Sequence, residues 1–337
     1  MILGKGTYGE VSRKNNKAVK KFKSLNHLIQ EYAALKYLSD CSKIVKCVGV
    51  SFENLELHME LYDLSLRGWL QKYKGRLEEK KVMVIIHDVL LGLVQLQERG
   101  FAHGDIKPSN ILVRESPLGA VLGDCGFVSV AKYSKVERTA APYRDPVIVR
   151  DINHDMFSLG ICFLELLGNV RLGEQHSYEA LKVLTKQVPR QDHAEIIRNL
   201  LHEDRSRRPP AQVVMQYLFS KASIHNESIG YREINIEEKP TGKIRSTMKR
   251  ICAQMRINRG RRGYTALMYY IQKNKIEISK HNIHAVAVLM ILSSVFGEKS
   301  CKQKEISMLM RVPHEDIHPI IGSMLSDDNF LHCLMRA

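Results

Sequence analysis

The stretch HGDIKPSNIL at residues 103–112 decides how the rest of this sequence is interpreted. It holds an aspartate, Asp105, then a lysine two residues later, Lys107, and an asparagine five residues after the aspartate, Asn110. The aspartate can accept the proton of a hydroxyl group, the lysine can neutralise a moving phosphate, and the asparagine can bind Mg²⁺. These three functions in one loop predict an enzyme of phosphoryl transfer.

A second metal ligand is expected shortly downstream. The apolar run at 120–122 is typical of a buried strand, and the residues Asp124-Cys125-Gly126 come soon after it. Carboxylate oxygens are ligands that Mg²⁺ prefers, and glycine permits a sharp turn. Asn110 and Asp124 are therefore the predicted metal ligands.

A phosphate-binding loop is predicted near the start of the chain. The stretch GKGTYGEV at residues 4–11 fits the pattern G-x-G-x-x-G-x-V. Because glycine has no side chain, backbone N–H groups can approach phosphate oxygens there. The predicted nucleotide-binding residues of this loop are Gly4, Gly6, Gly9 and Val11. An ordinary β-hairpin would give the same pattern, so the prediction of a phosphate-binding loop depends on the motifs around it.

An ion pair is expected next to this loop. Ala18-Val19-Lys20 lies on the next predicted strand, at a spacing that points the Lys20 ammonium toward the α- and β-phosphates of ATP. Apolar residues at helical spacing between positions 28 and 38 predict a helix. Glu31 on that helix is the natural partner of Lys20. The alternative is that Glu31 is a solvated surface acid.

In order and spacing, these motifs resemble those of the eukaryotic protein kinase family over residues 1–219. The stretch DMFSLG at 155–160 resembles the start of the family's central helix, whose aspartate supports the catalytic loop. The stretch DRSRRP at 204–209 resembles the family's late Asp-x-x-x-Arg-Pro element, and Lys107-Pro108 is its serine/threonine pattern.

The resemblance implies an α+β, two-lobed kinase fold, with an N-lobe at residues 1–61 and a C-lobe at 62–219. It implies ATP and Mg²⁺ as cofactors and a protein with serine or threonine acceptors as substrate. Asp105 would be the base, and Lys107, Lys20 and Glu31 would complete the catalytic set. Met59 falls at the gatekeeper position, and the backbone of Glu60 and Tyr62 should hydrogen-bond adenine in the hinge.

Two departures from the family pattern carry predictions. Gly104 replaces the arginine that often grips a phosphorylated activation loop, so we expect activity without such phosphorylation. The stretch YRDP at 143–146 resembles the substrate-positioning loop of cyclin-dependent and related kinases, but Val147 stands where they have glutamate. The usual ion pair of that glutamate with Arg208 therefore cannot form unless Asp145 substitutes for it.

An active kinase is the leading interpretation, because none of the residues usually lost from inactive relatives is missing. These residues are Lys20, Asp105, Asn110 and Asp124. One alternative is a pseudokinase scaffold that binds ATP without transferring phosphate. Another is a nucleic-acid-associated regulatory factor that uses the basic stretch at 239–262.

A second domain is predicted after a polar linker at 220–242. Four helical segments are expected within residues 243–337, at 264–276, 283–296, 302–310 and 313–325. The apolar helix and the stretch KQKEISMLMRVP that follows it at 302–313 resemble the end of a cyclin box. Such a small all-α domain would dock in cis on the helix bearing Glu31. A generic helical bundle or winged helix is the alternative.

The formal net charge is +15, and residues 239–262 contain nine Lys or Arg and no acid. This stretch fits a nucleic acid or an acidic partner, or else a solvated basic linker. No apolar run reaches the roughly 18 residues of a membrane span, so no membrane partner is expected. The seven scattered cysteines suggest reduced thiols in a cytoplasmic or nuclear protein. The compact N-lobe resembles kinases of large DNA viruses, which would place the chain in a host cell or virion.

Overall fold

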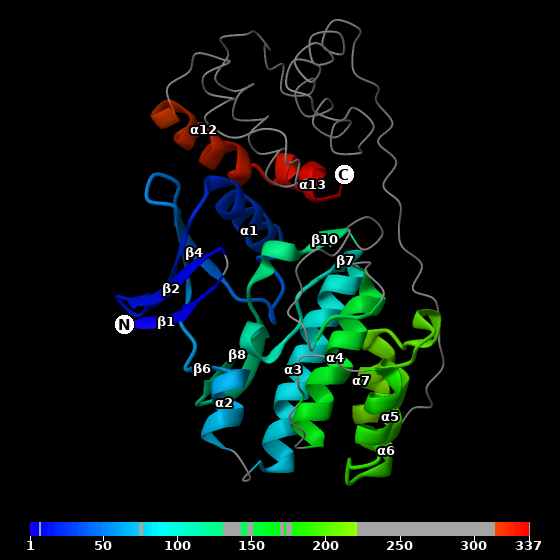
Figure 1. The fold of residues 1–337 in the computed structure, drawn as a ribbon. Coiled ribbons are helices and arrows are strands. Elements are labelled where there is room, and N and C mark those ends of the chain that lie inside the picture. Colours follow the sequence, from blue (N-terminus) through cyan, green and yellow to red (C-terminus); the bar gives the residue numbers. More distant parts are fainter. Residues whose placement is uncertain are drawn as a thin grey trace, which may run out of the picture. The chain divides into compact units, whose positions relative to one another are not determined.

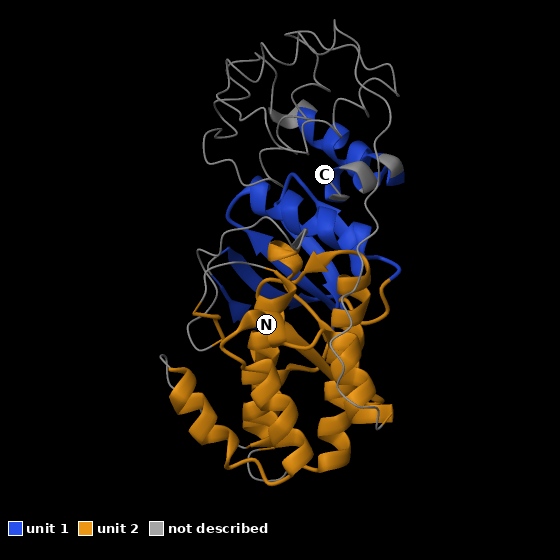
Figure 2. Ribbon diagram, turned by 90° about the vertical axis from the view of Figure 1, so that its right-hand side faces the viewer, with its two compact units in different colours: residues 1–40, 46–61, 233–337 blue, residues 41–45, 62–232 orange. Residues whose placement is uncertain are grey.

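The computed structural model describes residues 1–6, 8–73, 77–130, 143–146, 151–168, 172, 177–220 and 314–336. By its internal contacts the chain divides into two units (Figure 2). Unit 1 consists of residues 1–40, 46–61 and 233–337, and unit 2 of residues 41–45 and 62–232.

Unit 1 is built on a five-stranded antiparallel sheet in the order β1-β2-β3-β5-β4. Its strands are β1 (Ile2–Lys5), β2 (Gly9–Lys14), β3 (Lys17–Phe22), β4 (Cys47–Ser51) and β5 (Glu56–Glu60). The β2–β3 hairpin turns at Asn15 and Asn16, whose φ angles are 44° and 58°. Asparagine tolerates this left-handed conformation, which explains why the chain reverses there.

Helix α1 (Leu25–Tyr37) is enclosed on almost every side. Its residues 31–35 are all buried, and this run is longer than one helical turn, so it covers the whole circumference. Strands β3, β4 and β5 contact α1, as do two C-terminal helices, α12 (His314–Ser326) and α13 (Asp328–Arg336) (Figure 1). The C-terminal helices bury their own apolar residues, which are Ile317, Ile321, Met324, Leu325, Phe330, Leu331, Leu334 and Met335.

Unit 2 is mainly helical (Figure 1). Its described helices are α2 (Leu66–Lys72), α3 (Glu79–Glu98), α4 (Ile152–Leu167), α5 (Tyr178–Thr185), α6 (Gln191–Leu200) and α7 (Ala211–Ser220). Helix α2 ends at Lys72, and α3 begins only at Glu79. Gly100 follows the end of α3 with a φ of 77°, a conformation that glycine adopts without strain.

Two small antiparallel sheets position the loops of unit 2. Strands β6 (Leu64–Ser65), β8 (Ile111–Glu115) and β9 (Leu118–Leu122) form one sheet, and β7 (Phe101–Ala102) pairs with β10 (Ser129–Val130) in another. Three 3-10 turns are η1 (Pro108–Asn110), η2 (Cys125–Phe127) and η3 (Arg205–Arg207). The predicted catalytic loop therefore runs from β7 through η1 into β8, and β9 leads directly to Asp124.

Several predictions fall outside the described residues. They are the helices at 264–276, 283–296 and 302–310, the basic stretch at 239–262, and all but the first residue of the linker at 220–242. The segment predicted at 313–325 is confirmed as α12, whereas α13 was not predicted. Among the residues that the structure describes, no helix is long and apolar enough to cross a bilayer.

Candidate active site

The catalytic loop is fixed by the first turn of α4. The Asp155 carboxylate accepts hydrogen bonds from the backbone N–H of His103 at 2.5 Å and of Gly104 at 2.8 Å. All three residues are buried. Gly104 has a φ of 79°, a backbone conformation that glycine adopts without strain. The predicted support of this loop by an aspartate of the central helix is confirmed.

Asp105 lies at the centre of a small polar cluster. Its Oδ2 accepts hydrogen bonds from Lys107 Nζ at 2.6 Å and from Asn110 Nδ2 at 2.8 Å. Asn110 Nδ2 also donates to the backbone oxygen of Asp105 at 3.0 Å. The other carboxylate oxygen, Oδ1, is buried and has no hydrogen-bond partner in the described part of the chain. The three predicted residues thus meet, and they leave one carboxylate oxygen of Asp105, the predicted base, without a hydrogen bond.

Asn110 and Asp124 fit a Mg²⁺ ion. The two contacts with Asp105 fix the orientation of the Asn110 amide and leave its side-chain oxygen available to a metal ion. The backbone N–H of Gly123 donates to the Asn110 carbonyl at 2.8 Å and ties the two ligand segments together. Asp124 has a φ of 56°, a strained conformation of the kind found at functional sites. No group of three or more His, Cys, Asp or Glu suited to a metal occurs among the described residues.

His103 joins the catalytic loop to the Asp124 segment. Its Nδ1 accepts from the N–H of Asp105 at 3.3 Å, and its Nε2 contacts the carbonyl of Gly123 at 3.0 Å. One ring nitrogen accepts and the other donates, which requires the neutral imidazole. Burial lowers the pKa of His103 below its ordinary value, consistent with that state. The sequence motif contained His103, but its bridging role was missed.

In unit 1, the predicted ion pair is formed. Lys20 Nζ lies 2.6 Å from Glu31 Oε2, and the two side chains are only 10% and 2% exposed. The interpretation of Glu31 as a solvated surface acid is therefore wrong. A buried pair of this kind fixes both charges, since moving either one away leaves the other uncompensated.

The glycines of the loop at 4–11 differ in what surrounds them. A Cβ atom at Gly9 would lie 2.2 Å from the carbonyl oxygen of Lys21, so the close β2–β3 pairing requires glycine there. A Cβ at Gly4 would meet nothing within 4 Å, and one at Gly6 only the carbonyl of Gly9 at 3.8 Å. The space beside the Cα atoms of Gly4 and Gly6 is thus open, while the N–H of Gly6 donates to the Gly9 carbonyl at 2.8 Å. Val11 pairs with Lys20 across the β2–β3 ladder.

The predicted adenine contacts lie in both units. Glu60 ends β5, and its N–H donates to the Lys46 carbonyl at 3.0 Å, so any contact of its backbone with adenine must use the carbonyl oxygen. Met59, the predicted gatekeeper, is buried on β5. In unit 2, the Arg114 guanidinium lies 4.8 Å from the centre of the Tyr62 ring, a cation–π contact that anchors this side chain.

Asp145 takes over the ion pair that Val147 cannot make. Its carboxylate pairs with Arg208 at 2.5 Å, and both side chains are 0% exposed. Arg208 donates further to the carbonyls of His202 at 2.8 Å and Asn153 at 3.0 Å, and to the Tyr178 hydroxyl at 3.3 Å. Two more hydrogen bonds run from Arg208 to the Asp145 carboxylate, so all five N–H donors of the guanidinium are used.

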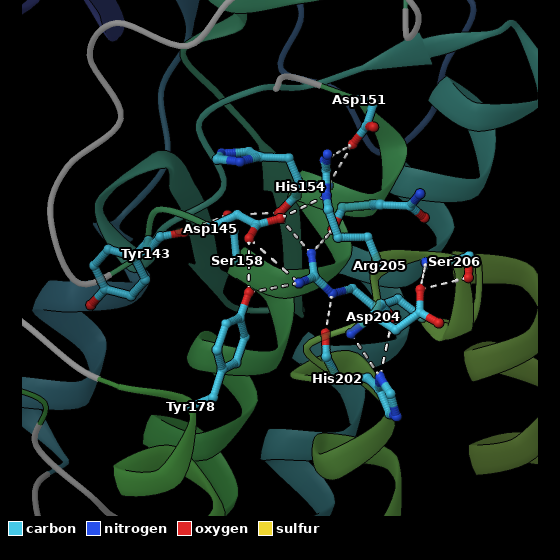
Figure 3. Close-up of polar contacts among 12 residues, drawn as sticks. Tyr143, Asp145, Asp151, His154, Ser158, Tyr178, His202, Asp204, Arg205 and Ser206 are labelled. Atoms are coloured by element: carbon cyan, nitrogen blue, oxygen red, sulfur yellow. Dashed lines mark hydrogen bonds and ion pairs between the residues drawn. The ribbon is translucent and has the colours of Figure 1, made fainter. Parts of the chain in front are cut away.

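A second arginine completes this network (Figure 3). Arg205 lies 3.0 Å from Asp145 and 2.5 Å from Asp151, the N-cap of α4, whose carboxylate also accepts from the His154 N–H at 2.9 Å. Burial raises the pKa of Asp151, and Arg205 opposes that shift. The two arginines and two aspartates balance each other in charge. The expectation that Asp145 could substitute for the missing glutamate is confirmed.

Tyr143 lies at the start of the same segment, and both its backbone and its side chain are bound to α4. Its carbonyl accepts from Ser158 Oγ at 2.7 Å, and its hydroxyl donates to Glu165 Oε2 at 2.8 Å. Arg67 contacts both that hydroxyl and Glu165. Burial raises the pKa of Tyr143 far above its ordinary value, so the hydroxyl stays protonated. Residues 143–146 are therefore fixed to α4, and the role of Arg67 was not foreseen.

Comparison with known proteins identifies relatives of this chain. A model of the protein kinase domain matches residues 1–220. A Wee1-like protein kinase of Arabidopsis thaliana is 29% identical over 202 residues, covering 56% of this chain and 40% of the relative. The serine/threonine-protein kinase SBK1 of Danio rerio is 32% identical over 171 residues, covering 46% and 44%. Myosin-IIIa of Homo sapiens is 28% identical over 263 residues, covering 64% and 16%. The chain thus spans less than half the length of these curated relatives.

Proposed function

This chain belongs to the protein kinase family, and from that premise we propose that it transfers the γ-phosphate of Mg-ATP to serine or threonine hydroxyls of a protein. Support comes from the family match and from a relative named as a serine/threonine-protein kinase. The single observation that carries the proposal is the state of Asp105. Lys107 and Asn110 hold one of its oxygens, and the other is buried without a partner among the described residues.

In the proposed reaction, Asp105 Oδ1 accepts the proton of the acceptor hydroxyl. The hydroxyl oxygen forms a bond to the γ-phosphorus while the bond between that phosphorus and ADP breaks. Lys107 and Asn110 prevent rotation of the carboxylate, because both donate to its Oδ2. The Lys107 ammonium also neutralises charge on the transferring phosphate.

The remaining site residues bind and orient ATP. Lys20, held by Glu31 at 2.6 Å, would orient the α- and β-phosphates, and the backbone at Gly4 and Gly6 would approach them. Glu60 would contact adenine through its carbonyl oxygen. Mg²⁺, held by Asn110 and Asp124, would neutralise charge on the phosphates.

Regulation in cis by the C-terminal region is part of the proposal. The contacts of α12 and α13 with α1 support it, because α1 carries Glu31. The likeness of residues 243–337 to a cyclin box, the viral origin, and a nucleic acid or acidic partner for 239–262 stay predictions from sequence. Cytoplasmic or nuclear location stays one as well.

Radiolabelled phosphate transfer from ATP to a generic protein substrate tests the function. The full chain should label serine or threonine, and Asp105→Asn should abolish the labelling while ATP binding persists. Glu98→Gln, which removes an exposed carboxylate at the end of α3, is the matched control and should label normally. ATP binding by the full chain without any transfer would overturn the proposal in favour of a scaffold.

A further inference from the structure

The backbone of the predicted phosphate-binding loop is tied to the segment that leads into α1. The N–H of Gly6 donates to the carbonyl of Gly9 at 2.8 Å, so the chain reverses between these two glycines. The carbonyl of Tyr8, inside this turn, accepts from the N–H of Lys23 at 3.1 Å, just beyond the end of β3. The position of the loop therefore depends on the start of α1.

The side chain of Tyr8 packs on α1 itself. Its ring lies against the imidazole of His27, with ring centroids 4.5 Å apart and planes inclined at 56°. Rings at this separation attract each other. The imidazole is oriented in turn, because its Nδ1 lies 2.8 Å from the hydroxyl of Ser24, within hydrogen-bond distance. Tyr8 and His27 are both half-buried, so water only partly surrounds the contact.

The short connection between β3 and α1 explains why these rings meet. Only Lys23 and Ser24 separate the end of β3 at Phe22 from the start of α1 at Leu25. Two residues reach at most about 7 Å. The first turn of the helix must therefore begin close to the end of the strand, where the loop is also attached.

His27 shares a face of α1 with Glu31. The two residues are four positions apart, and side chains at this spacing lie one above the other on a helix. Glu31 pairs with Lys20 at 2.6 Å, and His27 contacts Tyr8 one turn earlier. One face of α1 thus contacts both the lysine and the loop that are proposed to bind phosphate. We call Tyr8 and His27 the loop anchor, and all four residues belong to unit 1.

We infer that His27 is a positioning residue for the phosphates of ATP, acting through the ring of Tyr8. The loop anchor restricts the glycine loop to a conformation that rests on α1, so less conformational freedom is lost when phosphates bind there. Its effect is confined to the phosphate part of the nucleotide, since the loop is assigned to phosphate and not to adenine. The inference rests on the proposed kinase function and assigns part of the ATP affinity to α1.

Equilibrium titrations of the full chain with Mg-ATP and with adenosine test the inference. His27→Ala removes the ring that Tyr8 rests on and should weaken Mg-ATP binding about two- to ten-fold, the factor that one aromatic pair contributes. Adenosine, which has no phosphates, should bind this variant and the unmodified chain equally well. His27→Phe restores a ring and should restore the affinity for Mg-ATP. In a chain that already carries Tyr8→Ala, adding His27→Ala should weaken binding no further.

Ser39→Ala, an exposed change just beyond the other end of α1, is the matched control and should bind both ligands normally. The melting temperature of each variant is measured, and the titrations are run well below it. Normal Mg-ATP binding by His27→Ala, an equal loss for adenosine, or additive effects of the two changes would overturn the inference while the kinase function stands. Mg-ATP binding by the unmodified chain without phosphate transfer would instead refute the proposed function and leave the loop anchor in place.

Discussion

Replacing Asp145 by asparagine should destabilise unit 2 severely. The change is nearly isosteric, but it removes the charge that two arginines share, and Arg208 is 0% exposed. Removing one partner of a buried ion pair costs about 3–5 kcal/mol, because the remaining charge stays out of water. Whole domains are stable by only about 5–15 kcal/mol, so this loss is a large part of the total.

The expected loss corresponds to a fall in melting temperature of about 6–20 °C, at roughly 2–4 °C per kcal/mol for a domain of this size. Thermal and urea unfolding of the full chain measure it. Asp192→Asn is the control, since Asp192 pairs with Arg190 at 2.6 Å but both side chains are about half exposed, at 45% and 53%. An exposed pair contributes about 0–1 kcal/mol. The reasoning is refuted if Asp145→Asn destabilises no more than Asp192→Asn.

Three further changes have defined outcomes. Glu31→Gln removes the charge that holds a buried ammonium and should lower kcat/KM for ATP about a hundred-fold, as measured by steady-state kinetics; a loss of less than three-fold would contradict the role of the ion pair. Burial lowers the folded-state pKa of His103, so its contribution to stability is complete above the unfolded pKa of about 6.5 and is lost as the pH falls below it. Urea midpoints at pH 5 and pH 7 should therefore differ less in His103→Gln, and an unchanged difference would exclude this role. Gly9→Ala should lower the melting temperature by separating β2 from β3, since its Cβ would lie 2.2 Å from the Lys21 carbonyl, whereas Gly4→Ala should not; equal effects would disprove the steric argument.

Local patterns in the sequence were enough to predict most of the site. Asp105, Lys107 and Asn110 lie in one short loop, so their meeting required only that the loop turn back on itself. The pairing of Lys20 with Glu31 also followed from spacing, because a strand and the next helix leave little freedom for two residues eleven positions apart. Cyclin likeness and the function of 239–262 remain untested predictions.

Contacts between distant segments could not be predicted from local patterns. Asp145 meets Arg208 across 63 positions, and the sequence offered it only as one conceivable substitute for a missing glutamate. Arg67 reaches Glu165 across 98 positions, and nothing in either local pattern marked the pair.

The sequence by itself determined the chemistry proposed for this protein, because phosphate, metal and proton each demand particular side chains at short and regular intervals. Tertiary structure alone decided what holds that chemistry in place. It enclosed α1 between the sheet and the C-terminal helices, and it set the charge balance around Asp145. The physical reason is that a buried charge or a close helix contact depends on which surfaces exclude water together, and that depends on the folding of the whole chain.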